Sequence, residues 1–405
     1  MRPESAGGES SFRFLYPLAF LGAHLAFIPL LLLLLPRRVE RLFPLDSTTV
    51  LSITLIVGAV TASFAHVLAG HASDRWMARY GQRRVPIAVG LALLAATYFA
   101  LAAADTFALL MGAMVAFQVA LNMMLAPLSA LLSDHVEDRS KARTAAFLVL
   151  GLPISIAVCG PIGLAFPDDG SGAFSLVMIL VLVCILPLLV FWPSPRSIST
   201  VGEARPATTT VLDVPDFRRA WIARLLVQCG AALIIFYLYV YVRELPAQAG
   251  APAPLSSAMS LLVVVGGIAG AAAALIAGQL SDRLRRRRWP TAASAMVVAA
   301  GLLLLAAQPS WQAVLFGYAL FSAGLMAFLS NDAAMVAQML GSHPARGRWL
   351  GVMNLTNTIP AILTPTLTLL ALQTASLNAV TLLLISAACA ALTSAMLITR
   401  MASVP

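Results

Sequence analysis

Long runs of apolar residues, separated by short polar segments, recur along the whole chain. Each run holds about 20 residues or more, which is enough for an α-helix to cross a hydrocarbon core about 30 Å thick. The pattern predicts an all-α integral membrane protein with twelve transmembrane helices. Their expected ranges are 14–35, 48–70, 85–104, 107–132, 144–166, 173–193, 220–242, 255–279, 290–308, 312–339, 350–372 and 378–399.

The composition excludes a water-soluble fold. Of the 405 residues, 60% are hydrophobic and 11% are charged, whereas an ordinary soluble domain has about 25% charged residues. The net charge of +9 does not indicate a nucleic-acid partner, because the arginines lie in short loops between apolar runs and not on a soluble surface. We therefore expect the lipid bilayer to be one partner and nucleic acid to be none.

Lysine and arginine gather in alternate connections between the runs. The odd-numbered connections hold only Arg37, Arg38, Arg41 and Arg243, and nearly all the others lie in the even-numbered connections and the terminal segments. Because positively charged loops stay in the cytoplasm, both termini are predicted to be cytoplasmic, in an inner membrane.

The segment RRVER, Arg37–Arg41, is the exception to this charge pattern, since it falls on the outer side. We expect either a basic rim that attracts anionic solutes or a solvated loop that Glu40 and Asp46 partly neutralise. The leucine run before it has no small-x-small cleavage pattern, so we expect the first helix to be retained.

A polar stretch rich in Pro, Ser and Thr, residues 194–219, divides six predicted spans from six. A shift of 208 residues aligns Gly22-Ala23 with Gly230-Ala231, and GHASDR with GQLSDR. Since six is an even number, the halves have the same orientation, as in parallel repeats. We predict an N-terminal six-helix bundle (1–193), a cytoplasmic linker (194–219) and a C-terminal six-helix bundle (220–405).

Twelve spans, a central linker and a repeated G-x-x-x-D-R signature followed by basic residues resemble the major facilitator superfamily. The first copy is unusual, because Trp76–Tyr80 separates Asp74-Arg75 from the basic Gly81–Arg84. This lengthened form is similar to the glycoside and sucrose cation-symporter branch, and the stretch Ser330–Pro360 also resembles bacterial relatives of that branch. The resemblance implies secondary transport by alternating access of two bundles, without a cofactor.

The repeated signature predicts a gate at the inner rim. The resemblance implies that Asp74 faces the start of span 11 and Asp282 the start of span 5, where a helix N-terminus favours a carboxylate. The alternative is that the arginines only enforce topology. The candidate gating residues are Asp74, Arg75, Arg143, Asp282, Arg283 and Arg348.

Asp332 is the one acidic residue predicted well within a span. An acid there costs about 2.5–3.5 kcal/mol on insertion scales, so it must face protein or water. The family resemblance implies that spans 1, 4, 7 and 10 line a central cavity, which makes Asp332 the first candidate for proton coupling and His24 on span 1 the second. The alternatives are a structural Asp332 hydrogen-bonded beside Asn331, and a His24 that serves helix packing.

Polar side chains four residues apart share a helix face on span 4, Gln118 with Asn122, and on span 7, Arg224 with Gln228. These faces suit a hydrogen-bonding solute, and hydrogen bonds between helices are the competing explanation. The candidate substrate-binding residues are Gln118, Asn122, Gln228, Tyr237, Asn331, Asn354 and Asn357.

Two further patterns bear on function. Tyr237, Tyr239 and Tyr241 ascend span 7, as an aromatic belt at the membrane interface does, although Tyr237 is also placed to meet the cavity. On span 5, Gly151–Gly163 partly resembles an antiporter motif, and its alternative is a small-residue packing face with a proline bend.

Together the patterns predict a secondary active transporter for a small organic solute, sugar-like among the candidates, working by proton-coupled symport as a monomer. A proton-antiport exporter of drugs or metabolites is the alternative, and a transporter-like receptor or scaffold is a remote one. The sequence has no ATP-binding motif, no nucleophile-base pair in the spans and no metal-ligand cluster, so we expect neither an enzyme nor a cofactor or metal.

Overall fold

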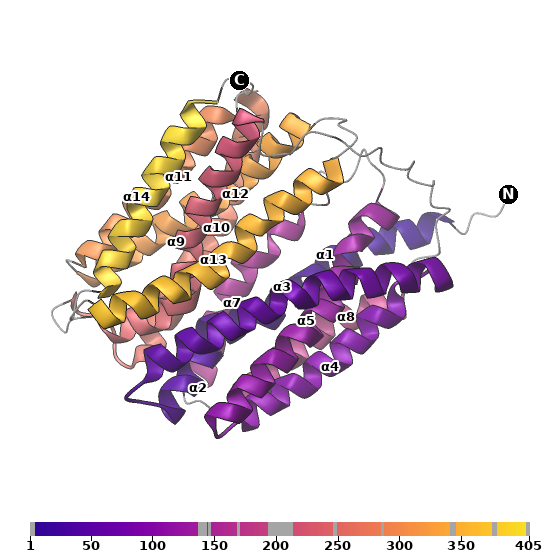
Figure 1. Ribbon diagram of the computed structural model, residues 1–405, viewed down its shortest axis with the longest axis horizontal. Helices are drawn as coiled ribbons and strands as arrows, with labels where there is room; N and C mark the ends of the chain where they lie inside the picture. Colours follow the sequence, from indigo (N-terminus) through magenta and orange to yellow (C-terminus); the bar gives the residue numbers. More distant parts are fainter. Residues whose placement is uncertain are drawn as a thin grey trace. The chain divides into compact units, whose positions relative to one another are not determined.

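The computed structural model is helical throughout the residues it describes, which are 5–136, 144, 147–167, 171–192, 214–245, 249–284, 287–308, 310–340, 346–374 and 379–401 (Figure 1). Two compact units make up the fold. The first comprises Met1–Ser155 and Ile162–Thr200, and the second comprises Ile156–Pro161 and Val201–Pro405.

Helices of the first unit begin with α1, a π-helical segment η1 and α2, which follow one another without a break. The bounds are α1 Ser5–Pro29, η1 Leu30–Leu34, α2 Leu35–Leu42, α3 Ser47–Tyr80, α4 Arg84–Ala103, α5 Phe107–His135, α7 Gly151–Ala165 and α8 Ser171–Val190. The middle of α7, Ile156–Pro161, belongs to the second unit.

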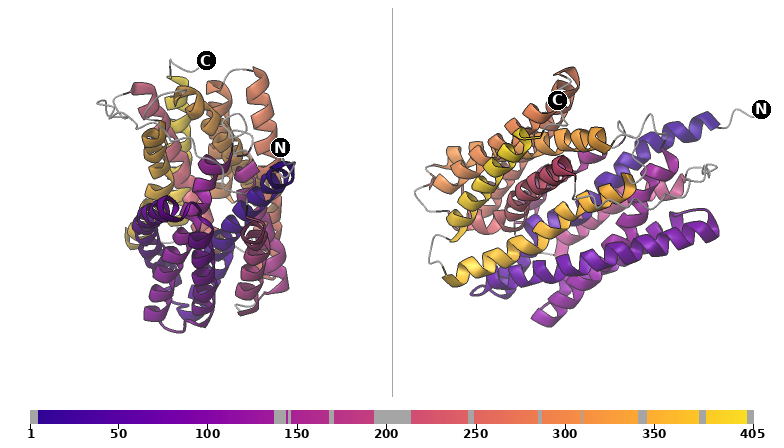
Figure 2. Two further views of the ribbon diagram at one scale, coloured as in Figure 1. Left: turned by 90° about the vertical axis from the view of Figure 1, so that its right-hand side faces the viewer. Right: turned by 45° about the horizontal axis from the view of Figure 1, so that its top comes forward.

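The second unit contains six described helices, whose colours run from rose to yellow in Figure 2. Their bounds are α9 Pro215–Arg243, α10 Leu255–Leu284, α11 Arg288–Ala307, α12 Trp311–Leu340, α13 Arg346–Thr374 and α14 Ala379–Thr399.

The same pairs of helices pack together in both units. In the first unit α3 and α4 both pack on α5, and α8 packs on α1 and α4. In the second unit α10 and α11 both pack on α12, and α14 packs on α9 and α11. Each pairing in one unit is therefore found six spans later in the other, as a sequence repeat of six spans requires.

Glycines explain how closely two of these pairs approach. A Cβ on Gly90 of α4 would lie 2.5 Å from the backbone nitrogen of Met124 in α5, and one on Gly301 of α11 would lie 2.5 Å from that of Phe321 in α12. Only a residue without a Cβ lets the helix backbones meet at this distance. Small residues at membrane-helix contacts thus determine the packing of both units.

Eleven helical segments among the described residues are long and apolar enough to cross a membrane. The helix α13, which occupies the predicted span 350–372, is not one of these eleven, and it carries asparagines, threonines and two prolines. The predicted all-helical membrane fold is confirmed.

Two predicted boundaries are wrong at the polar ends of spans. The linker was expected to extend through Arg219, but α9 begins at Pro215, where proline is favoured in the first helical turn and Asp216 interacts well with the helix dipole. Asp216 also pairs with Arg219 at 2.6 Å, one turn later. Residues 194–213 lie outside the described residues.

The expected outer loop at Arg37–Arg41 is also wrong, because these residues form α2. The Arg37 side chain donates a hydrogen bond of 2.9 Å to the carbonyl oxygen of Phe166, which caps α7. Arg38 donates two, of 3.2 and 2.7 Å, to the carbonyl oxygen of Ala104, which caps α4. Unpaired carbonyls and the negative end of the dipole attract cations to a helix C-terminus, so Arg37 and Arg38 anchor helix ends and the solvated loop does not describe them. The basic outer rim stays a prediction.

We expect Arg38→Ala to lower the free energy of unfolding by about 1–2 kcal/mol, because the carbonyl end of α4 loses its cation and two hydrogen bonds. Thermal or denaturant unfolding of the purified protein measures this. Arg13→Ala, at an exposed position, serves as the control and should change stability by less than about 0.5 kcal/mol. Equal stability of the two variants would contradict the capping role.

Candidate functional site

The five residues that lengthen the first signature are helical. Trp76–Tyr80 extends α3 beyond the predicted end of span 2 by further turns. The helix then ends at Gly81, whose φ of 70° is left-handed and whose N–H donates to the carbonyl of Met77 at 2.8 Å. A glycine accepts this backbone conformation without strain. The chain thereby turns back, and Arg83 returns to the side of α3.

Arg83 joins the ends of α3 and α5. It contacts Asp74 at 2.8 Å and Asp134 at 2.6 Å, and it donates a hydrogen bond of 2.7 Å to Ser73. Burial opposes the charge on Arg83, but hydrogen bonds and attraction from Asp134 and Asp74 outweigh it and raise the pKa of the guanidinium. Asp74 thus has a partner within its own unit, whereas the resemblance implied that it faces the start of span 11.

The other predicted gating residues contribute less to the described site. Arg75 is exposed. Arg143 lies outside the described residues, and the side chains of Asp282, Arg283 and Arg348 do as well, although their backbones lie in α10 and α13. The gate role of all six residues stays a prediction.

An ion pair joins two membrane-spanning helices in the second unit. Arg224 of α9 contacts Asp332 of α12 through Nη1 and Oδ2, which are 2.8 Å apart. The Asp332 side chain is 1% exposed and that of Arg224 is 18% exposed. At 1.5 Å per residue, Asp332 lies about 12 Å from the end of α12 at Leu340, so both charges are held within the spans and neutralise each other.

Three amide side chains extend this ion pair onto α13. The Oδ1 atom of Asn357 accepts hydrogen bonds from Arg224 Nη2 at 3.4 Å and from Gln228 Nε2 at 2.6 Å. Asn357 in turn donates to Asn354 Oδ1 at 2.9 Å. Gln228, Asn354 and Asn357, which the sequence proposed separately, therefore form one polar group with Asp332 and Arg224.

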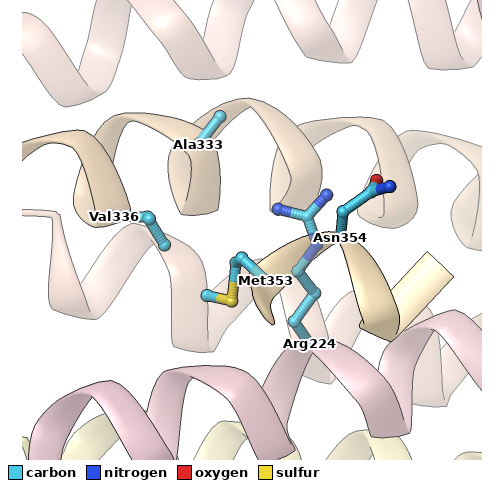
Figure 3. Close-up of a pocket in the computed structure, with 5 residues that line it drawn as sticks. All are labelled: Arg224, Ala333, Val336, Met353 and Asn354. Carbon is cyan, nitrogen blue, oxygen red and sulfur yellow. The ribbon is translucent and has the colours of Figure 1, made fainter. Parts of the chain in front are cut away.

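A cavity of about 190 Å³ opens beside this group. Figure 3 draws the side chains that line it, among them the guanidinium of Arg224 and the amide of Asn354. The cavity combines this polar end with apolar walls, and its lining consists of Arg224, Ala333, Val336, Met353 and Asn354.

Two other expected site residues are Asn331, which is buried, and His24, which is partly buried. Asn331 is 1% exposed, and its Oδ1 has no hydrogen-bond donor among the described residues. His24 donates from Nδ1 to the carbonyl of Phe20 at 2.9 Å, and its ring lies 5.6 Å from those of Phe20 and Phe27. Gly151 of α7 leaves room for it, so His24 takes part in helix packing in this structure.

The polar face of α5 is used between helices. His66 of α3 donates from Nδ1 to Asn122 Oδ1 at 3.0 Å, and Asn122 Nδ2 donates to the backbone carbonyl of Gln118 at 2.9 Å. Gln118 and Asn122 are 7% and 5% exposed. The bond to His66 matches the interhelical alternative for Asn122, whereas the bond to Gln118 lies within α5.

An interfacial belt does not describe the tyrosines of α9. Tyr237, Tyr239 and Tyr241 are 4%, 7% and 3% exposed, and Tyr241 donates to the carbonyl of Leu305 in α11 at 2.8 Å. A belt residue would keep its hydroxyl in water at the membrane surface. The belt expectation is therefore wrong for all three.

The sequence profile of the Major Facilitator Superfamily matches residues 5–365 and again residues 248–404. The chain belongs to the Major Facilitator Superfamily. It is a membrane transporter, as the members of this family are. The predicted resemblance to this family is confirmed.

Solved structures of this fold include a bacterial homologue of the human lysosomal transporter Spinster. Its inward-facing unoccupied form matches with a TM-score of 0.66 and its inward-facing occupied form with 0.63. Both are 12% identical in sequence, over 98% of this chain and 95% of theirs. At this identity the match establishes the transporter's fold alone. None of the curated proteins matches the chain by sequence.

The site residues predicted from the sequence include Asp332 but neither Arg224 nor Arg83. The signal for Arg224 was available, because a cation within a span requires an anion and Asp332 is the one acid predicted at a comparable depth. For Arg83 the signal was weaker, since its contact with Asp134 depends on the turn at Gly81.

Removing either member of the central ion pair should destabilise this transporter more than removing both. Arg224→Gln or Asp332→Asn leaves one buried charge unpaired, at a cost of about 3 kcal/mol, whereas the double variant leaves none. Thermal unfolding in detergent of the four proteins of this double-mutant cycle measures the coupling. Additive losses in the double variant would show that the two side chains do not depend on each other.

Proposed function

We propose that this transporter moves a small organic solute together with protons across the cytoplasmic membrane, by alternating access and with both termini inside the cell. Asp332 takes up the proton. The observation that carries the proposal is the ion pair between Asp332 and Arg224 on two spanning helices, beside a cavity with a polar end.

Asp332 has the properties that coupling requires. Its Oδ2 binds Arg224, and its Oδ1 finds no hydrogen-bond donor in the described part of the chain. A proton on this carboxyl cancels the attraction to Arg224, and α9 and α12 then lose the ionic contact that holds them together. Protonation thereby changes the relative stability of conformations, which is what a coupling ion must do.

Asp332→Asn should abolish proton movement while retaining solute exchange. Proteoliposomes that contain a pH-sensitive dye report protons, and counterflow of a radiolabelled solute reports exchange; the solute comes from a thermal-shift screen of the purified protein. Asp216→Asn, which removes another Asp–Arg pair on α9, serves as the matched control and should retain both activities. Proton movement at the wild-type level in Asp332→Asn would remove Asp332 from the mechanism.

The direction of the pH change separates symport from antiport. Addition of solute outside should acidify the lumen if solute and proton enter together. An alkaline change would instead favour the proton-antiport exporter, which the helical Gly-Pro pair Gly160-Pro161 in α7 supports to a smaller extent. Solute binding without any movement would favour a receptor or scaffold.

We also propose that the ion pair between Asp74 and Arg83 stabilises one of the conformations of the transport cycle. Asp74→Asn removes one of two carboxylates from Arg83, so we expect the rate of transport to fall by about tenfold, which corresponds to about 1.4 kcal/mol, while solute affinity changes little. Initial rates and equilibrium binding on the same preparation measure this. The control is Asp105→Asn, at an exposed position, and a wild-type rate in Asp74→Asn would contradict the gate role.

A further inference from the structure

We propose that the solute is an organic anion bearing a carboxylate or phosphate group, that Arg224 binds this group, and that Asp332 is the internal anion with which it competes. This inference rests on the proposed proton coupling and adds the chemical class of the solute to it. It follows from how Arg224 is bonded, what the cavity offers and which charges surround the pair.

Arg224 has hydrogen-bonding capacity left over. A guanidinium carries five N–H donors, and in this structure Nη1 donates to Asp332 and Nη2 makes a long bond of 3.4 Å to Asn357. The Nε atom is buried without an acceptor among the described residues. An arginine in this state can bind a second planar or tetrahedral anion, which its fork of donors fits well.

The cavity places that anion at Arg224. Arg224 and Asn354 form the polar part of its lining, and Ala333, Val336 and Met353 form the apolar part. Its volume of about 190 Å³ favours a small solute. A small carboxylate or a phosphate group with a short carbon chain fits such a space, and the apolar walls suit the chain.

The neighbouring amides complete an anion site. Gln228 Nε2 and Asn357 Nδ2 are donors that at present bond to other amides at 2.6 and 2.9 Å. Amide–amide bonds are weaker than bonds to a charged oxygen. A bound anion therefore gains stronger hydrogen bonds than those it replaces.

The charge balance links this anion to the proton. Arg224 is the charged group that contacts Asp332, at 2.8 Å. Gly278 of α10 lies beside Ser330, and Ser294 and Val298 of α11 lie beside Gly324; all are uncharged. When a proton neutralises Asp332, Arg224 loses its counter-ion, and a monoanion from solution restores neutrality.

Anion binding to the purified full-length protein in detergent tests the inference without a gradient. The probes are sodium acetate, sodium lactate and inorganic phosphate, each compared with sodium chloride at equal ionic strength, and the readout is the shift in unfolding temperature with concentration. At least one probe should stabilise the wild type, more strongly as the pH falls. A larger shift with acetate or lactate than with phosphate indicates a carboxylate solute, and the reverse indicates a phosphate solute.

If Asp332 competes with the solute for Arg224, substitutions of these two residues change the affinity for the anion in opposite directions. In Asp332→Asn the stabilising probe should bind about tenfold more tightly than to the wild type at neutral pH, and its affinity should no longer depend on pH. Arg224→Gln should abolish the effect, and Arg224→Lys should retain part of it. Asp216→Asn should behave as the wild type. The unfolding temperature of each variant with the probe is compared with that of the same variant in sodium chloride, so a loss of stability does not affect the result.

No stabilisation of either the wild type or Asp332→Asn by any probe would overturn the inference, and so would equal affinities in the two proteins, which indicate a purely structural ion pair. Neither result concerns the pH change measured in proteoliposomes. Proton movement driven by a neutral solute would leave the proposed function standing without the anion site. Anion binding without proton movement would leave the site standing without the proposed coupling.

Discussion

A charged side chain inside the hydrocarbon core must be neutralised by a partner, and this requirement shapes the transporter at every level. Within the spans Arg224 binds Asp332 at 2.8 Å. At the ends of α3 and α5, Arg83 lies between two carboxylates. At the far end of the first span, Arg37 and Arg38 neutralise the carbonyl ends of other helices. The ion pair between α9 and α12 is therefore where the proposed proton would act, because a proton on Asp332 removes the charge that Arg224 binds.

The repeat explains the scaffold and also shows where the halves have diverged. Gly22 and Gly230 occupy equivalent places, since Gly22 lies against Cys184 and Ile185 of α8 and Gly230 lies near Ala387 of α14. Six residues before these glycines, however, α1 has Tyr16, which is fully buried, and α9 has Arg224. The helix packing is thus shared, whereas the charged group belongs to the second unit alone among the residues described.

The length of the apolar runs predicted the order of the spans, because a membrane imposes a minimum length on every helix that crosses it. It could not predict where polar ends continue as helix, as at Trp76–Tyr80 and Arg37–Arg41, because there capping and ion pairs decide and not hydropathy. Asp332 could be found from its sequence alone, as an isolated acid in a span. Its bond to Arg224 and the linkage through Asn357 to Gln228 depend on the rotation of three helices, which no residue spacing within one helix specifies.

The proposed anion site also explains why a proton and a solute would move together. Arg224 and Asp332 form a neutral pair, and with a proton and a monoanion bound the site would be neutral again. A proton alone leaves a buried cation without a counter-ion, and an anion alone leaves two negative groups on one guanidinium. Both states place a net charge in a region of low dielectric constant, where it costs several kcal/mol. On this proposal the half-loaded states are sparsely populated, and the transporter would change conformation with both partners bound or with neither.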